Sequence, residues 1–267
     1  MTTHPRRTLA AFLLTVLLLA AHDAGSDPVP VRLNEGLVHG FLVLSAADGT
    51  HLADGDLEQT ARGGRVTSRL VFRFVDGSIH DDNAVFDERR QFAFVSEHLV
   101  QKGPSFPRAI DMTVDAAGQA TVHYTDDHGA AKTASERFDT KGELANGMIL
   151  TLLKNVRPDN APRELSMIVA TPAPRLVKMK LSVASRDRFS TGRRARTAVH
   201  YVLKADIGGI EGVVAPLVGK QPPDSHVWVL EGDAPAFVKS EQPFFAGGPL
   251  WTIELTSPVW PRTTAAR

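Results

Sequence analysis

The chain has 267 residues, and its 30 basic residues balance its 30 acidic ones, so the formal net charge is zero at pH 7. Domains that bind nucleic acid usually carry a strongly basic face, and this composition predicts no nucleic-acid partner. Because cysteine is absent, thiol catalysis, cysteine-ligated metals and disulfide bonds are excluded.

The N-terminus has the pattern of an export signal. Arg6 and Arg7 give it a basic start, and residues 9–21 are apolar except for Thr15. This run is too short for a membrane span, which needs roughly 20 apolar residues. We therefore expect residues 1–26 to be a signal peptide and residues 27–267 to form a single β-rich domain. No later segment is apolar enough to predict a transmembrane span, so we expect a periplasmic or secreted protein.

The first half of that domain alternates between β-rich stretches and turn signals. In "RVTSRLVFRF", Val66, Leu70, Phe72 and Phe74 fall on one face of a strand. The turn signals recur at short intervals between residues 37 and 137: Asp48-Gly49, Gly63-Gly64, Asp76-Gly77, Arg89-Arg90, Gly103-Pro104, Ala117-Gly118 and His128-Gly129. Long consecutive strands joined by tight turns predict an antiparallel meander, which tends to curl.

The strand period breaks once, over residues 139–156. Leu144, Met148, Leu152 and Val156 recur at every fourth position, which is the pattern of an amphipathic helix. We expect this helix to cover about residues 141–155, to pack on the concave face of the sheet, and to approach it closely at Gly147.

Strands resume after Pro162, most clearly in "LVKMKLSV", where Val177, Met179, Leu181 and Val183 share a face. The predicted fold class is therefore mainly β: a strongly curved antiparallel meander, as a half-barrel or open barrel, wrapping one central amphipathic helix. The export signal, the order of elements and the mid-chain helix resemble the half-barrel lipoprotein carriers of the LolA and LolB type, and related exported families of unknown function. That resemblance implies a concave face that holds an apolar ligand or an acyl chain.

Three polar stretches are candidates for chemistry. "GSIHDDNAVFDERR" includes His80 and Asp82, but neighbouring strand residues point to opposite faces, so a solvated strand is the simpler interpretation. "HYTDDHG" is typical of a hairpin turn, and the arginines of "DRFSTGRRAR" indicate either an exposed loop or an anion site. No short motif of a hydrolase, metalloprotease or nucleotide-binding site is present, so we predict no catalytic residues, metal or cofactor.

The stretch "GKQPPDSHVWVLEGDAPAF" offers two interpretations. Lys220, Asp224 and His226 are candidates for a polar cluster, whereas the prolines and Trp228 favour a rigid aromatic edge of the sheet. The first interpretation leaves open a hydrolase with a site near Asp224 and His226. The second favours a protein that is not an enzyme.

The preferred hypothesis is an exported envelope protein that binds or carries an apolar or lipid-like molecule in a cavity of the curved sheet. A non-enzymatic structural or interaction module of the envelope, with a protein partner, is the alternative. The residues expected to line the cavity come from the helix, from strands and from the tryptophan-rich end: Met148, Leu152, Met179, Tyr201, Trp228 and Trp251.

Overall fold

A computed structural model describes residues 28–140, 143–162, 164–191, 194–206 and 222–256. The predicted signal peptide and Lys220 lie outside these residues. The first eight strands are β1 (Val38–Ser45), β2 (His51–Arg62), β3 (Arg65–Phe74), β4 (Ile79–Glu88), β5 (Phe92–Lys102), β6 (Ile110–Asp115), β7 (Gln119–Thr125) and β8 (Ala131–Arg137). A helix, α1 (Ile149–Asn155), and a short 3₁₀ turn, η1 (Pro158–Asn160), follow. The remaining strands are β9 (Glu164–Val169), β10 (Arg175–Thr191), β11 (Arg194–Asp206), β12 (Ser225–Leu230), β13 (Phe237–Gln242) and β14 (Trp251–Leu255).

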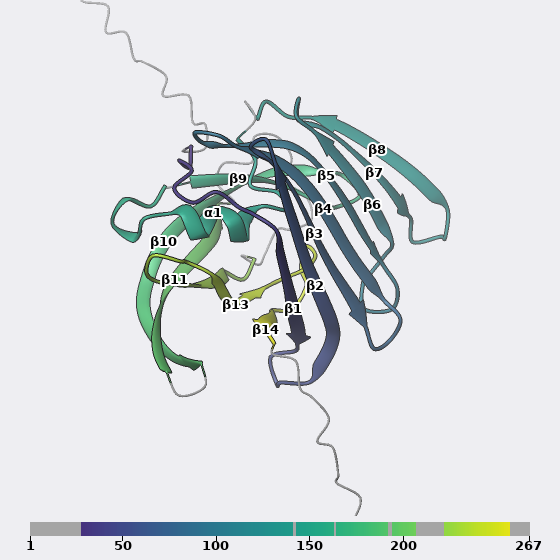
Figure 1. The fold of residues 1–267 in the computed structure, drawn as a ribbon. Coiled ribbons are helices and arrows are strands. Elements are labelled where there is room, and N and C mark those ends of the chain that lie inside the picture. Colours follow the sequence, from purple (N-terminus) through teal and green to yellow (C-terminus); the bar gives the residue numbers. More distant parts are fainter. Residues whose placement is uncertain (1–27, 141–142, 163, 192–193, 207–221, 257–267) are drawn as a thin grey trace, which may run out of the picture.

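All fourteen strands belong to one antiparallel sheet in the order β8-β7-β6-β5-β4-β3-β2-β1-β14-β13-β12-β11-β10-β9. The chain therefore builds two meanders, and its first and last strands join them in the middle of the sheet, where Leu42 lies opposite Leu255. The sheet curls around α1, with β1–β8 on one side and the long β10–β11 hairpin curving along the other (Figure 1). The predicted fold class, a curved antiparallel meander around one helix, is confirmed.

The turn signals of the first half are confirmed as the hairpin connections from β1 to β8. In the turn between β7 and β8, for example, Asp126 Oδ1 accepts hydrogen bonds from the amides of His128 and Ala130. Gly129 takes a positive φ of 80° there, a conformation that side chains disfavour. Local sequence chemistry thus decides where each strand ends.

The helix is shorter than predicted. It covers seven residues; before it, Leu144 forms a parallel bridge to Ser166 of β9, and residues 146–148 form a turn. The predicted helical pattern fails at Gly147, whose φ of 59° lies in the left-handed region. The predicted close approach to the sheet is present, because a Cβ at Gly147 would lie 2.4 Å from the Cβ of Ala84 on β4.

Candidate functional site: the inner face of the curved sheet

The inner face of the sheet is largely apolar. On β3, Val66, Phe72 and Phe74 are buried and belong to the same core cluster as Leu152 and Leu153 of α1. The alternation of strand side chains puts the arginines of β3 on the opposite, outer face, where Arg65 and Arg69 pair with Asp87 and Asp81 of β4. The apolar side of β3 is therefore its inner side, and the charged side faces out.

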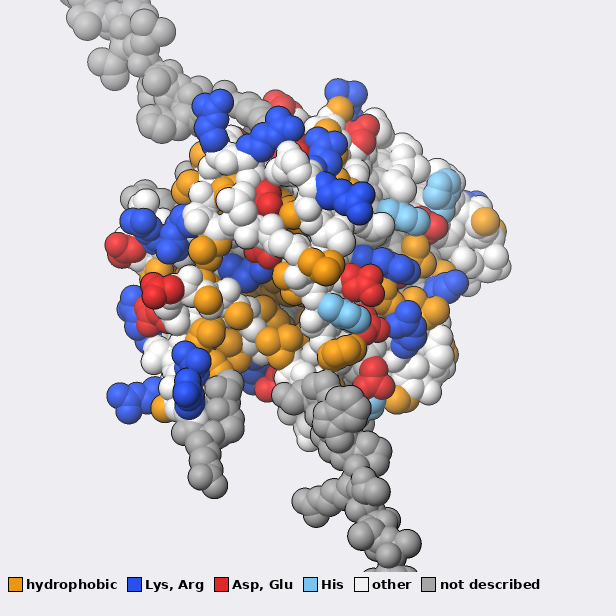
Figure 2. Space-filling model, in the orientation of Figure 1, with side chains coloured by type: hydrophobic (Ala, Val, Ile, Leu, Met, Phe, Trp, Pro, Cys, Tyr) orange, Lys and Arg blue, Asp and Glu red, His pale blue; other side chains and the backbone are white. Residues whose placement is uncertain are grey.

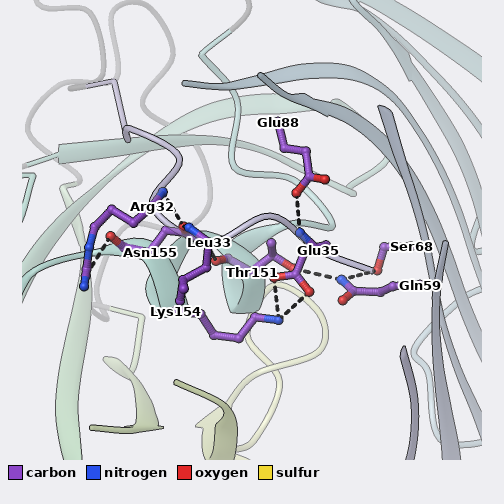
Figure 3. A network of polar contacts seen from close by, with 9 residues as sticks. All are labelled: Arg32, Leu33, Glu35, Gln59, Ser68, Glu88, Thr151, Lys154 and Asn155. Carbon is purple, nitrogen blue, oxygen red and sulfur yellow. Dashed lines mark hydrogen bonds and ion pairs between the residues drawn. The ribbon is translucent and has the colours of Figure 1, made fainter. Parts of the chain in front are cut away.

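Polar side chains attach α1 to this face (Figure 3). Gln59 of β2 is buried, and its Nε2 donates to Thr151 Oγ1 of the helix at 2.8 Å and to Ser68 Oγ of β3 at 3.2 Å. At the far end of the helix, the hydroxyl of Tyr201 on β11 donates to the carbonyl of Val156 at 3.2 Å. A buried hydrogen bond requires a defined geometry, so these contacts fix the position of α1 between β2 and β11.

The extended segment before β1 is tied to the same helix (Figure 3). Asn155 Oδ1 accepts the backbone amides of both Arg32 and Leu33 at 2.8 Å, and Lys154 forms an ion pair with Glu35 at 2.7 Å. The amide of Glu35 donates to Glu88 Oε2 at 2.6 Å, and burial raises the pKa of the Glu88 carboxyl above its usual range. Helix, N-terminal segment and β4 therefore form one connected unit inside the sheet.

A second polar group lies beside the start of the helical region. Asn146 Nδ2 donates to Glu97 Oε2 of β5 at 3.0 Å and to the carbonyl of Ile168 at 2.8 Å, while its Oδ1 accepts the amide of Ile168 at 2.8 Å. Burial, with the charge of Asp81 adding to it, raises the pKa of Asp82 to about 7. Burial also raises the pKa of Glu97 well above its usual range, and the charge of Asp82 raises it further. These two inner carboxyl groups therefore hold protons at pH values where exposed carboxyls are ionised.

The sequence interpretation of β4 as a solvated strand is wrong for its inner face. His80 is buried, and Asp82 Oδ1 is buried with no hydrogen-bond partner among the residues that the structure describes. Burial lowers the pKa of His80 to about 4, and Gln101 Nε2 donates both to His80 Nδ1 at 3.1 Å and to the carbonyl of Phe244 at 2.6 Å. The signal that would have found this was available, since His80 and Asp82 share strand parity with the apolar Phe86.

Five of the six predicted cavity residues lie on the inner side. Met148, Leu152, Tyr201 and Trp251 are buried in the core cluster, and Met179 is half-buried against it. Trp251 packs among phenylalanine rings, with centroid distances of 5.3 Å to Phe244, 5.4 Å to Phe74, 6.0 Å to Phe245 and 6.2 Å to Phe106. The aromatic end of the chain thus fills part of the inside of the sheet.

Trp228 lies on the outer face, separated by the sheet from the other five. Its ring stacks on His200 with centroids 4.2 Å apart, its Nε1 donates to Asp187 Oδ2 at 2.8 Å, and Lys239 Nζ lies 5.1 Å from its ring centroid. Alternation along β12 gives the reason, because Val227 and Val229 are buried inward and Trp228 between them must point outward.

This outer cluster includes His226, one of the candidates for a hydrolase site. His226 Nδ1 lies 2.9 Å from His200 Nε2, and His200 Nδ1 lies 3.3 Å from Ser185 Oγ. However, Ser185 Oγ donates to Asp187 at 2.7 Å, while that carboxylate lies 3.8 Å from His200. The serine hydrogen is directed to the carboxylate and not to a histidine base, so the arrangement does not form a nucleophile–base–acid relay. Among the described residues, no hydrogen bond or ion pair joins Asp224 to this cluster.

Sequence reasoning missed Gln59, Glu97 and Asn146, which hold the inside of the sheet together. None of these three residues belongs to a sequence motif, and only the pairing of distant strands brings them to the helical region. Among the described residues, no group of three or more histidine, aspartate or glutamate side chains is placed to hold a metal ion. Within the same residues, no helix has the length and apolar character needed to span a membrane.

Comparison of the chain with known proteins gave a likeness to a solved structure and no match by sequence. No family model matches it, and no curated protein matches it. A solved structure, described as a β-barrel-like protein of domain of unknown function DUF1849 from Brucella abortus, is similar at 9% identity and a TM-score of 0.46. The match covers 86% of this chain and 100% of the other. The chain's own strand order, independently of this likeness, defines it as an open, curved antiparallel sheet around one helix.

Proposed function

We propose that this protein is exported to the cell envelope and binds an apolar or lipid-like molecule on the inner face of its sheet. The observation that carries the proposal is apolar surface left uncovered where β1, β2 and β14 meet. Leu255 lies opposite the buried Leu42, so its side chain faces inward, yet it is 47% exposed. Ligand sites are typically concave and apolar, and exposed apolar surface of this kind often marks one.

The neighbours of Leu255 extend this apolar surface. A Cβ at Gly40 would lie 3.6 Å from Leu255 Cδ2 and 3.9 Å from the Cβ of the half-exposed Leu57, which places all three side by side on the inner face. Figure 2 shows hydrophobic side chains around a hollow between the β10–β11 hairpin and β1. A helix of only seven residues leaves this part of the inner face open to an acyl chain.

The proposal keeps the inner residues of the sequence prediction in a supporting role. Met148, Leu152, Tyr201 and Trp251 form the packed floor beneath the ligand, and Met179 of β10 lies at its margin. Trp228 takes no part in binding. The export route and the likeness to LolA- and LolB-type carriers belong to the same proposal, because an envelope location would supply lipid-like ligands.

Binding is tested by titrating the purified protein, residues 27–267, with parinaric acid and with the dye 1-N-phenylnaphthylamine. We expect saturable binding. Leu255→Glu puts a charge on the apolar surface and should weaken binding at least about tenfold, which corresponds to about 1.4 kcal/mol. Val75→Glu is the matched control, because Val75 is 72% exposed on the β3–β4 turn, and Trp228→Phe is a control on the outer face. Non-saturable binding, or equal loss in Leu255→Glu and Val75→Glu, would contradict the proposal.

A further inference from the structure

The two edges of the open sheet are treated differently by the chain. At the β9 edge, the segment before α1 covers the strand: Leu144 bridges to Ser166, the Ala145 amide donates to the Ser166 carbonyl at 2.8 Å, and the Asn146 amide group bonds both backbone groups of Ile168. At the β8 edge, β7 is the one strand that pairs with β8 among the described residues. The β8 edge is therefore available for pairing.

The free backbone groups of β8 can be assigned from its pairing with β7. The Phe138 amide donates to the Gly118 carbonyl, and the Asp126 amide donates to the Ala130 carbonyl, so the even-numbered positions of β8 bond β7. The direction of the backbone N–H and C=O groups alternates along a strand. These groups therefore point away from β7, out of the sheet edge, at the odd-numbered positions Ala131, Thr133, Ser135 and Arg137. Unpaired groups of this kind are a template for another strand.

The side chains of β8 do not protect its edge. The strand reads AKTASER and contains no proline. Six of its seven residues are exposed, and they include residues on each face of the sheet. Thr133 and Ser135 lie on the outer face, where they contact His123 and Thr121 of β7. Lys132 and Glu136 lie on the inner face with Ala134, and the Lys132 ammonium lies 3.6 Å from Asp126 at the turn.

This sequence is complementary to itself when two copies run antiparallel about Ala134. Lys132 of one copy then lies opposite Glu136 of the other, twice, and Thr133 lies opposite Ser135. The odd-numbered pairs exchange about eight backbone hydrogen bonds across the two-fold axis. The charged pairs fall at the non-hydrogen-bonded positions, where side chains approach more closely and opposite charges stabilise the pairing.

We propose that β8 is a dimerisation edge, which pairs with β8 of a second copy of this chain in antiparallel register centred on Ala134. The partner is identified by the match in charge, in backbone direction and in length. The two curved sheets join into one continuous sheet through an isologous two-fold contact. The proposal is independent of ligand binding, because β8 lies at the opposite end of its meander from β1.

The absence of cysteine makes the register directly testable. In Ala134→Cys, the two introduced sulfurs would face each other across the axis with Cα atoms about 4.5 Å apart, within disulfide range. In the control Thr133→Cys, the two Cα atoms would be roughly 9 Å apart, beyond that range. We expect diamide to cross-link Ala134→Cys into a dimer at least about tenfold faster than Thr133→Cys. Equal rates would overturn the proposed register.

Charge reversal tests the pairing without cross-linking. Analytical ultracentrifugation of the unmodified protein should show a concentration-dependent dimer, weakened about tenfold by Lys132→Glu or by Glu136→Lys, since each places two like-charged pairs across the axis. The double variant Lys132→Glu/Glu136→Lys restores opposite charges and should recover the dimer to within about threefold. Far-UV circular dichroism verifies that each variant is folded. A monomer at all concentrations, or a dimer insensitive to both reversals, would refute the proposal.

Discussion

Gly147 lies at the point where the helical region meets the sheet, and Gly147→Ala tests whether that contact is as close as the structure gives it. The added Cβ would lie 2.4 Å from the Cβ of Ala84 and 3.1 Å from Asp82 Oδ1. The first distance is far below van der Waals contact, and overpacking of this kind costs about 1–3 kcal/mol. The positive φ of 59° adds about 1–2 kcal/mol for a residue with a side chain. We therefore expect the free energy of unfolding to fall by about 2–5 kcal/mol.

The assay is urea denaturation followed by circular dichroism, with Gly129→Ala as the matched control. Gly129 also has a positive φ, of 80°, but a Cβ there would meet nothing within 4 Å, so its substitution should cost only the conformational part. In a double-mutant cycle, Ala84→Gly removes the opposing Cβ, and Gly147→Ala should cost about 1–3 kcal/mol less in that background. If Gly147→Ala is no more destabilising than Gly129→Ala, the close packing of this segment on β4 is refuted.

Two further predictions concern the same region. Leu152 is 3% exposed, so Leu152→Ala should lower the free energy of unfolding by about 2–5 kcal/mol, and a loss below about 1 kcal/mol in urea titration would mean that the inner face of α1 is not buried. Asp82 has a pKa raised from 3.8 to about 7 in the folded protein, so the stability it contributes is fully present below about pH 4 and is lost as pH rises through about 7. Asp82→Asn should therefore lose less stability than the unmodified protein between pH 5 and pH 8, by at most about 3 kcal/mol, and parallel stability profiles for the two proteins would contradict a protonated Asp82.

The buried ionisable groups of the inner face make the stability of the protein depend on pH. His80 has its pKa lowered to about 4, so its neutral form supports folding above about pH 6.5, and that support is lost as pH falls through 4. The carboxyl pair of Asp82 and Glu97 acts in the opposite direction, because raised pKa values favour folding at the acid end. Between about pH 4 and 6.5 the contributions of His80 and Asp82 offset each other, and Glu97 makes the net contribution of these groups to stability fall as pH rises.

The sequence by itself determined the local elements of this protein. Alternation such as that of Val66, Phe72 and Phe74 predicts strands, and pairs such as Asp76-Gly77 predict the hairpin turns, because both depend on backbone preferences of neighbouring residues. The same alternation points Trp228 in the direction opposite to Val227 and Val229, although the prediction that Trp228 lines the cavity did not use it. The existence of one helix was also local information, since its apolar stripe has the helical period.

Tertiary structure decided how these elements meet. That β1 joins β14 in mid-sheet depends on contacts between the two ends of the chain, which no local pattern encodes. The helix begins only after Gly147, and not near residue 141 as predicted. The sheet leaves no room for a Cβ at Gly147, and Asn146 bonds the edge of β9. The burial of Asp82 likewise follows from what covers β4, and not from β4 itself. Side chains and backbone preferences set each strand, whereas long-range pairing sets which surfaces are enclosed and which, such as Leu255, remain open.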